Sequence, residues 1–144
     1  MSHTRFLFHI VFATKDRFPL IAPRWESELY KYITGIVRNL RGRVIEINGT
    51  ADHIHILVSL APCDFPALMR ELKASSPRWA KRHHPKFSWQ RRYGAFTVSE
   101  SAVDAVRDYI RRQKEHHQKR TFEDEYVTLL RKHNIEFDQQ YLWD

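Results

Sequence analysis

The segment at residues 53–60 (HIHILVSL) constrains the fold of this 144-residue chain more than any other stretch, because its side chains alternate in polarity. In a strand, neighbouring side chains point to opposite faces of the sheet. One face therefore carries only aliphatic side chains, namely Ile54, Ile56, Val58 and Leu60. The other carries His53, His55, Leu57 and Ser59. The sequence predicts a strand whose aliphatic face is covered by helices and whose opposite face holds two imidazoles.

Periodicity predicts the other elements. Strands are expected at residues 5–13, 43–48 and 89–99, and helices at residues 23–40, 64–83, 101–118 and 123–132. Asp64, followed by Pro66, is a candidate cap for the second helix, and Ser101 with Asp104 resembles a capping box for the third. The order βαββαβ predicts an α+β, ferredoxin-like antiparallel sheet with helices on one face, followed by an extra C-terminal helix. The other face of the sheet would be left available.

Length and charge favour one basic globular domain over residues 1–144. The chain has 24 Lys and Arg against 17 Asp and Glu, and 42% of its residues are hydrophobic, which excludes extended disorder. An acidic ending, residues 121–144, has six acids and two bases, so residues 1–120 carry a net charge of +11. A polyanion is the natural partner of such a body.

The basic residues concentrate between positions 70 and 92, where eight bases accompany one acid and Trp79, Trp89 and Tyr93 are interleaved. Such a pattern favours contact with a nucleic-acid backbone and unpaired bases over a solvated helix face above core aromatics. The candidate DNA contacts here and on the third helix are Arg78, Lys81, Arg82, Arg91, Arg92, Arg111 and Arg112.

Cysteine usage and hydropathy indicate a cytoplasmic protein. Cys63 is the single cysteine, so no intrachain disulfide can form. The apolar stretch at residues 6–13 is too short and too polar for a membrane span or a signal sequence. We expect no association with a membrane.

Two groups of residues carry candidate chemistry. His53 and His55 lie on the same side of their strand, ~6.6 Å apart at Cα, close enough to reach one divalent cation. Tyr109 and Gln113 fall on the inward stripe of their helix, about 6 Å apart along its axis. A buried amide needs a partner, and a metal would satisfy its carbonyl oxygen. Taken alone, a helix tyrosine is more often a core residue, and for His9 a structural role is favoured.

Two further histidine pairs, His83/His84 and His116/His117, are expected to be phosphate contacts or surface residues. Adjacent side chains on a helix diverge by about 100°, so the members of a pair cannot easily share a metal.

Four stretches in order resemble the single-tyrosine HUH transposases of the smallest bacterial insertion sequences, the IS200-like group. They are HIVFATKDR at 9–17, the His-Ile-His motif at 53–55, WQRRYGAFTVSES at 89–101 and YIRRQ at 109–113. The ending at residues 122–143 also resembles that of many members. The resemblance covers nearly the whole chain.

The resemblance implies that His53, His55 and Gln113 hold Mg²⁺ or Mn²⁺ and that Tyr109 is the nucleophile. It implies cleavage and rejoining of single-stranded DNA with an imperfect hairpin, through a 5′-phosphotyrosine intermediate and a free 3′-hydroxyl. The resemblance implies a homodimer, because members commonly place the tyrosine helix of one subunit beside the histidines of the other. The spacing in the sequence does not distinguish action of Tyr109 in cis from action in trans. Such a protein would work at the bacterial nucleoid.

Alternatives remain open from the sequence. Within the same chemistry, the chain could be a domesticated nuclease that acts on repeated genomic hairpins, or a replication-initiation nuclease. From other classes, it could be a non-catalytic module that binds single-stranded nucleic acid, or a small metal sensor. The sensor leaves the basic body unexplained, and the binding module would place aromatics where this chain has His53 and His55.

Overall fold

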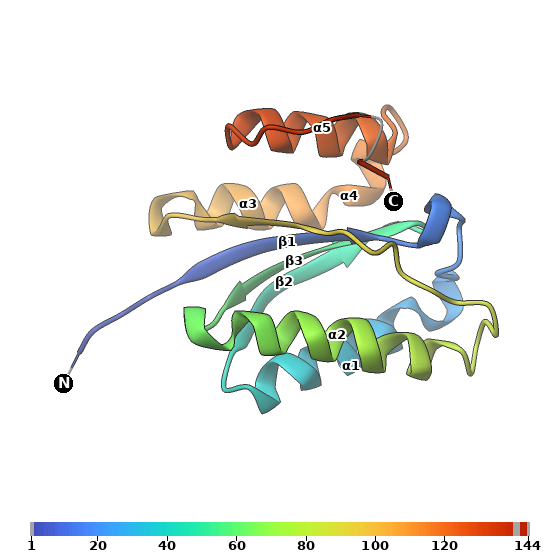
Figure 1. Ribbon diagram of the computed structural model, residues 1–144, viewed down its shortest axis with the longest axis horizontal. Helices are drawn as coiled ribbons and strands as arrows, with labels where there is room; N and C mark the ends of the chain where they lie inside the picture. The colour runs from blue at the N-terminus through green and yellow to red at the C-terminus, as the bar shows by residue number, and fades with distance from the viewer. Residues whose placement is uncertain (1, 140–141, 144) are drawn as a thin grey trace.

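The computed structural model describes residues 2–139, 142 and 143. A four-stranded antiparallel sheet in the order β2-β3-β1-β4 forms its centre, and two groups of helices cover its two faces (Figure 1). The strands are β1 (Leu7–Ala13), β2 (Arg43–Gly49), β3 (His53–Ser59) and β4 (Gly94–Thr97). The helices are α1 (Pro23–Asn39), α2 (Phe65–Ala80), α3 (Val103–Arg111), α4 (Gln113–His116) and α5 (Phe122–Lys132). This order confirms the ferredoxin-like α+β prediction.

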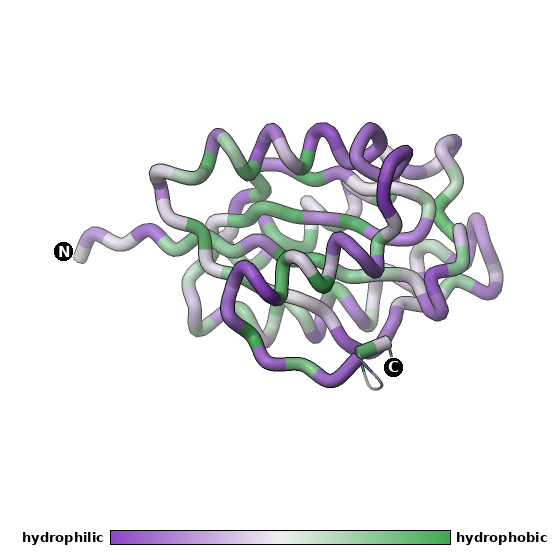
Figure 2. The backbone as a smooth tube through the Cα atoms, turned by 90° about the horizontal axis from the view of Figure 1, so that it is seen from above, coloured by the Kyte–Doolittle hydropathy of each residue, from purple (hydrophilic) through white to green (hydrophobic). Residues whose placement is uncertain are grey.

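The aliphatic face of β3 forms the larger core. Ile54, Ile56 and Val58 are fully buried, and they pack with α1 and α2 below the sheet as drawn in Figure 1. In β1, Ile10 pairs with Ile56, so the same face is apolar across the central strands. Figure 2 shows the strands as mostly hydrophobic and the helices as alternating between hydrophobic and hydrophilic residues. The expected alternation of β3 is confirmed.

The second face of the sheet is not open, which corrects the expectation that it would be left available. Helices α3, α4 and α5 lie above it (Figure 1). Helix α5 buries Phe122, Tyr126, Leu129 and Leu130 against the sheet residues Val11, Ala13 and Phe96. These four positions recur at helical spacing, which gives α5 one apolar face. The acidic ending therefore starts with a helix that packs onto the sheet.

The last strand is shorter than predicted. Residues 89–93 were expected to belong to it, yet Trp89 makes only an isolated bridge with Thr14. Trp89 belongs to the core below the sheet, where its Nε1 donates to Ser76 Oγ at 2.8 Å. Phe96 belongs to the core above the sheet. Residues 94–97 pair with β1, whereas residues 90–93 leave the ladder after the bridge at Trp89.

Two predicted side-chain caps and one predicted helix end are wrong, although α2 does begin directly after Asp64. Asp64 precedes α2 without a side-chain capping bond, and Ser101 lies in a 3₁₀ turn, Glu100–Ala102, rather than in a capping box. Helix α2 ends at Ala80 rather than near residue 83, since the N–H groups of Arg82 and His83 bond three residues back. Helix α5, by contrast, has a side-chain cap, because Thr121 Oγ1 accepts from the N–H of Asp124 at 3.2 Å.

The helix predicted over residues 101–118 is broken at Arg112. Asn48 of β2 donates its side-chain N–H groups to the carbonyl oxygens of Ile110 and Arg111, at 3.1 and 3.0 Å. A side chain that bonds to helical carbonyls disturbs the ladder and causes a local break. Tyr109 and Gln113 consequently lie on separate helices, α3 and α4.

Among the residues that the structure describes, no helix combines the length and the apolarity that crossing a bilayer requires.

Candidate functional site

Strand β3 places His53 and His55 side by side on the upper face of the sheet, and both side chains are fully buried. Their Nδ1 atoms are held by fixed partners. His53 Nδ1 lies 2.8 Å from Asp52 Oδ1, and His55 Nδ1 lies 2.8 Å from His9 Nε2. Histidines that bind metals are commonly oriented in this way through their other ring nitrogen. The arrangement directs both Nε2 atoms into the space below α3, α4 and α5.

Helices α3 and α4 bring Tyr109 and Gln113 to the same space. Gln113 is fully buried, with Oε1 at 2.9 Å from His53 Nε2. The ring of Tyr109 meets the ring of His55 edge to face, with a centroid distance of 5.8 Å. The four groups singled out in the sequence thus converge within one chain, although the break at Arg112 separates the two helical residues.

Helix α5 supplies a residue that the sequence analysis missed. Glu125 is fully buried, and its carboxylate accepts from Gln113 Nε2 at 3.0 Å and from the hydroxyl of Tyr109. Its Oε1 lies 2.9 Å from His55 Nε2 and 3.0 Å from His117 Nε2. The signal was present, because Glu125 lies three residues after Phe122 and four before Leu129, on the apolar face of α5.

His117 and His116 also differ from expectation. His117 belongs to the cluster through Glu125, and its ring centroid is 4.3 Å from that of His53. His116 stacks on Tyr109 at 4.9 Å. Neither is a plain surface residue, because both side chains are half-buried at the end of α4. His83 is exposed and stacks on Trp25, a member of the core below the sheet, with a centroid distance of 5.2 Å.

The cluster is electrostatically tuned. Burial lowers the pKa of His55 to about 4 and that of His9 to about 3, so both rings are neutral. Burial alone would raise the pKa of Glu125, but hydrogen bonds from His117 and His55 and the neighbouring imidazoles hold it well below its usual range. Burial and the charge of Glu125 raise the pKa of Tyr109, and Arg120 acts in the opposite direction.

The donor set fits a divalent cation. Ligand atoms of His53, His117 and Glu125 all lie within 4.8 Å of one another, and His55 Nε2 adjoins the same carboxylate oxygen. The predicted set of His53, His55 and Gln113 contained no carboxylate. Oxygen anions are the ligands that Mg²⁺ prefers, and imidazoles also suit Mn²⁺ and other transition metals, so Glu125 improves the site for either predicted ion.

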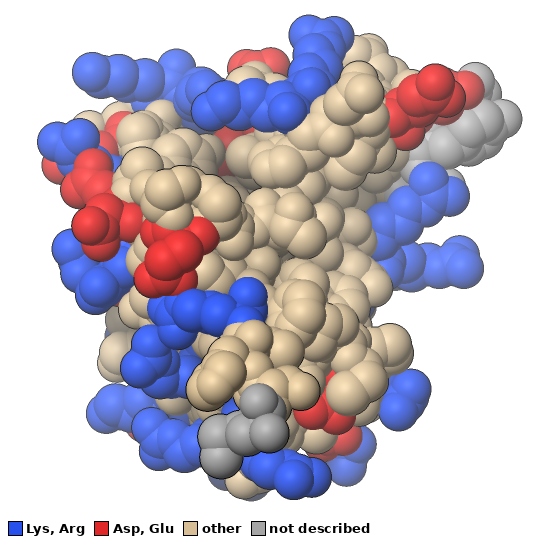
Figure 3. Space-filling view, turned by 90° about the vertical axis from the view of Figure 1, so that its left-hand side faces the viewer, with Lys and Arg blue, Asp and Glu red and all other residues tan. Residues whose placement is uncertain are grey.

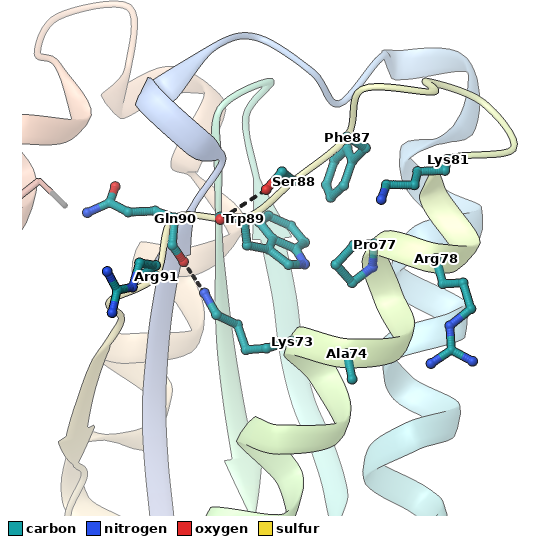
Figure 4. Close-up of a pocket in the computed structure, with 10 residues that line it drawn as sticks. All are labelled: Lys73, Ala74, Pro77, Arg78, Lys81, Phe87, Ser88, Trp89, Gln90 and Arg91. Atoms are coloured by element: carbon teal, nitrogen blue, oxygen red, sulfur yellow. Dashed lines mark hydrogen bonds between the residues drawn. The ribbon is translucent and has the colours of Figure 1, made fainter.

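Of the predicted DNA contacts, Arg78, Lys81 and Arg91 line a hollow of about 580 Å³ between α2 and residues 87–91 (Figure 4). We call it the basic hollow. Lys73 reaches across it from α2 to the carbonyl of Gln90, while Trp89 and Pro77 form its apolar wall (Figure 4). The basic hollow lies on the α2 side of the molecule, away from Tyr109.

The remaining candidates are spread out. Arg82 and Arg92 are exposed, whereas Arg111 pairs with Glu46 at 2.7 Å and Arg112 with Glu115 at 3.4 Å. Figure 3 shows Lys and Arg side chains along the upper and lower edges of one end of the molecule, with uncharged residues and a group of Asp and Glu side chains between them. The structure therefore gathers three of the seven predicted contacts in one hollow and leaves two paired with acids.

Comparison of the sequence with known protein families identifies the family of the chain. The family described as "Transposase IS200 like" matches residues 2–113. The chain belongs to this family. The match ends before His117 and Glu125, so these two members of the cluster lie outside it. No curated protein matches the chain in sequence.

Two solved structures share the fold. One is a candidate transposase from Deinococcus radiodurans R1, with a TM-score of 0.63 and 21% identity over 78% of this chain and 93% of that chain. The other is a REP-associated tyrosine transposase bound to a REP hairpin, with a TM-score of 0.62 and 18% identity over 81% of this chain and 74% of that chain. At these identities the likeness supports the α+β fold.

Proposed function

We propose that this transposase cleaves and rejoins single-stranded DNA next to a hairpin, with Tyr109 as the nucleophile and a divalent cation at the histidine–glutamate cluster. The observation that supports it best is the convergence of Tyr109, His53, His55 and Gln113 around one buried carboxylate within one chain. Because Tyr109 contacts the cluster of its own chain, we propose that it acts in cis.

The reaction is a transesterification. The Tyr109 oxygen attacks the scissile phosphorus, the bond from phosphorus to the 3′ oxygen breaks, and a 5′-phosphotyrosine and a 3′-hydroxyl result. Glu125 is the acceptor that the phenol already faces, so the phenolic proton leaves toward it. The departing 3′ oxygen takes up one proton from water, and Glu125 returns its proton to water, so the proton balance is closed. Since the imidazoles keep the pKa of Glu125 low, proton transfer accompanies formation of the new bond. The phosphodiester energy is conserved, and the step can be reversed.

His53, His55, His117 and Glu125, with Gln113, are the residues that would hold Mg²⁺ or Mn²⁺. A bound cation would neutralise charge on the scissile phosphate and fix its orientation toward the phenol. Asp52 and His9 orient the two strand histidines for this task. A non-catalytic binding module would have no use for this buried constellation, so we place that alternative second.

The first test is covalent capture of DNA. Wild-type protein incubated with Mn²⁺ and a pool of hairpin-forming single-stranded DNAs should form an adduct that resists denaturing electrophoresis. Tyr109→Phe should abolish the adduct, a loss of several orders of magnitude, while leaving DNA binding nearly intact. His53→Ala should also abolish it without unfolding the protein. An adduct that persists in Tyr109→Phe would show that another residue attacks.

Mixing the two inactive variants decides between cis and trans action. If Tyr109 acts in cis, a mixture of Tyr109→Phe and His53→Ala stays inactive. Recovery of adduct in the mixture would instead establish a homodimer with composite sites, as the family resemblance implies.

The basic hollow is proposed to contact DNA phosphates. Arg91→Ala should weaken hairpin binding and reduce the slope of log affinity against log salt by about 1. Arg131→Ala, at an exposed position on α5, is the control. A slope unchanged from wild type would exclude Arg91 as a phosphate contact.

A further inference from the structure

A second hollow, of about 520 Å³, lies between α3 and α5 directly beside the proposed nucleophile. Tyr109 and His9 form its inner end, and His9 contacts His55 of the cluster. We call it the α3/α5 hollow. Its volume is within the range of about 300–1,000 Å³ that is common for small-ligand sites. Because Tyr109 lines the α3/α5 hollow, a ligand bound there would lie beside the proposed nucleophile.

Its lining is apolar with a cationic border. Val98, Ala102, Val106 and Leu129 contribute aliphatic walls. Arg120, Lys132 and His133 also line it, and none of its described lining residues is an Asp or a Glu. Apolar walls suit a flat, weakly polar ring, and the cations suit the phosphates on either side of that ring.

A neighbouring hollow differs in charge. It opens beside Asp52 and His117 and carries the acids Glu26, Glu123 and Asp124 as well as bases. Arg120 lines both hollows, so they meet at this residue, close to Tyr109. The acids of the neighbouring hollow balance its bases, whereas no described acid lines the α3/α5 hollow, so a polyanionic strand that crosses the nucleophile is favoured on the α3/α5 side of Arg120.

We propose that the α3/α5 hollow binds one of the two nucleobases that flank the scissile phosphate, so that the protein itself selects a base at the cleavage point. This inference rests on the proposed function. It assigns base selection to side chains of α3 and α5, in addition to any recognition of the hairpin.

Sequencing of captured adducts tests the proposal. The probe is a pool of hairpin-forming single-stranded DNAs with randomised flanks, incubated with Mn²⁺; both the Tyr109-linked strands and the released strands are sequenced. Wild type should show a base bias at one position adjacent to the cleaved bond. Ala105→Phe, which fills the hollow from α3, should erase that bias and slow adduct formation by about 10-fold or more. Ala61→Phe, at an exposed position that does not line the hollow, is the matched control.

An abasic nucleotide at the biased position gives an independent measurement. It should slow adduct formation by wild type by about the same factor. It should cause little further loss in Ala105→Phe, because the introduced Phe side chain already occupies the space that the base would fill. Thr128→Phe, from the facing helix, replaces Ala105→Phe if that variant does not fold. Adducts without flanking bias, formed equally by wild type and the filled variants, would overturn the base site alone. Absence of any wild-type adduct would instead contradict the proposed function.

Discussion

The two faces of the seven-residue strand β3 are buried in different ways: one by hydrophobic packing and the other in a network of polar contacts. On the lower face, Ile54, Ile56 and Val58 are buried against α1 and α2 and need only apolar neighbours. On the upper face, His53 and His55 are as completely buried, but each ring nitrogen has its own polar partner. The apolar face needs only close packing of aliphatic side chains, whereas the polar face needs a partner at a fixed position for every ring nitrogen.

The difference separates stability from chemistry. Burial of the lower face stabilises the fold by removing apolar area from water. The upper face buries polar groups whose desolvation is offset by hydrogen bonds, so its net contribution to stability is smaller. Substitutions on the lower face should therefore lower the free energy of unfolding and leave metal affinity unchanged. Substitutions in the cluster on the upper face should mainly lower metal affinity.

The largest effect on stability is expected for Ile56→Ala, at the centre of the lower face. The cavity and the lost burial should reduce the free energy of unfolding by about 2–5 kcal/mol, while the Mn²⁺ affinity of the folded protein stays unchanged. Urea denaturation and calorimetric titration measure the two quantities. Ile135→Ala, at a residue that is 41% exposed, is the control and should change neither.

Glu125→Gln is expected to show the converse signature on the upper face. An amide is a weaker ligand than a carboxylate for these cations, so Mn²⁺ affinity should fall by about 10- to 100-fold or more. Stability should fall less than in Ile56→Ala, since Gln is similar in size and keeps part of the hydrogen bonding. Glu136→Gln, at an exposed position, provides the control. Unchanged affinity in Glu125→Gln would remove Glu125 from the ligand set.

The smallest effect concerns Lys73, a cation next to the lower core. Burial lowers its pKa from 10.5 to about 8. Between these values the unfolded chain binds more protons than the folded protein, so the contribution of Lys73 to the free energy of unfolding rises with pH and is least favourable below pH 8. Lys73→Met should lack this rise. Denaturation of both proteins across the window checks it, and a pH-independent difference between them would contradict it.

Local patterns were sufficient for much of the fold. The alternation in residues 53–60 predicted both faces of β3, and the spacing of Leu29, Ile33, Ile36 and Val37 predicted α1. The break at Arg112 was not predictable in this way, because it arises from Asn48, which is 62 positions before Ile110. The crossing of Trp89 and Phe96 between the two cores likewise depends on packing partners distant in sequence.

Four of the six residues that converge in the candidate site were singled out from the sequence. His53, His55, Tyr109 and Gln113 were singled out from strand alternation, a helix stripe and a family resemblance, and the structure brings them together. Their roles stay predictions. Glu125 was missed because the apolar face of α5 that carries it was not considered. His117 was missed because adjacent histidines on a helix diverge, and the sequence does not show that Glu125 lies beside this one.

The position of Glu125 along the chain has a consequence for biosynthesis. Glu125 is translated 70 residues after His55 and 16 residues after Tyr109. A nascent chain that has not yet released α5 holds its nucleophile without the carboxylate that gathers the other groups. The reactive centre can therefore assemble only after α5 has been made, and a product terminated before Glu125 would lack it.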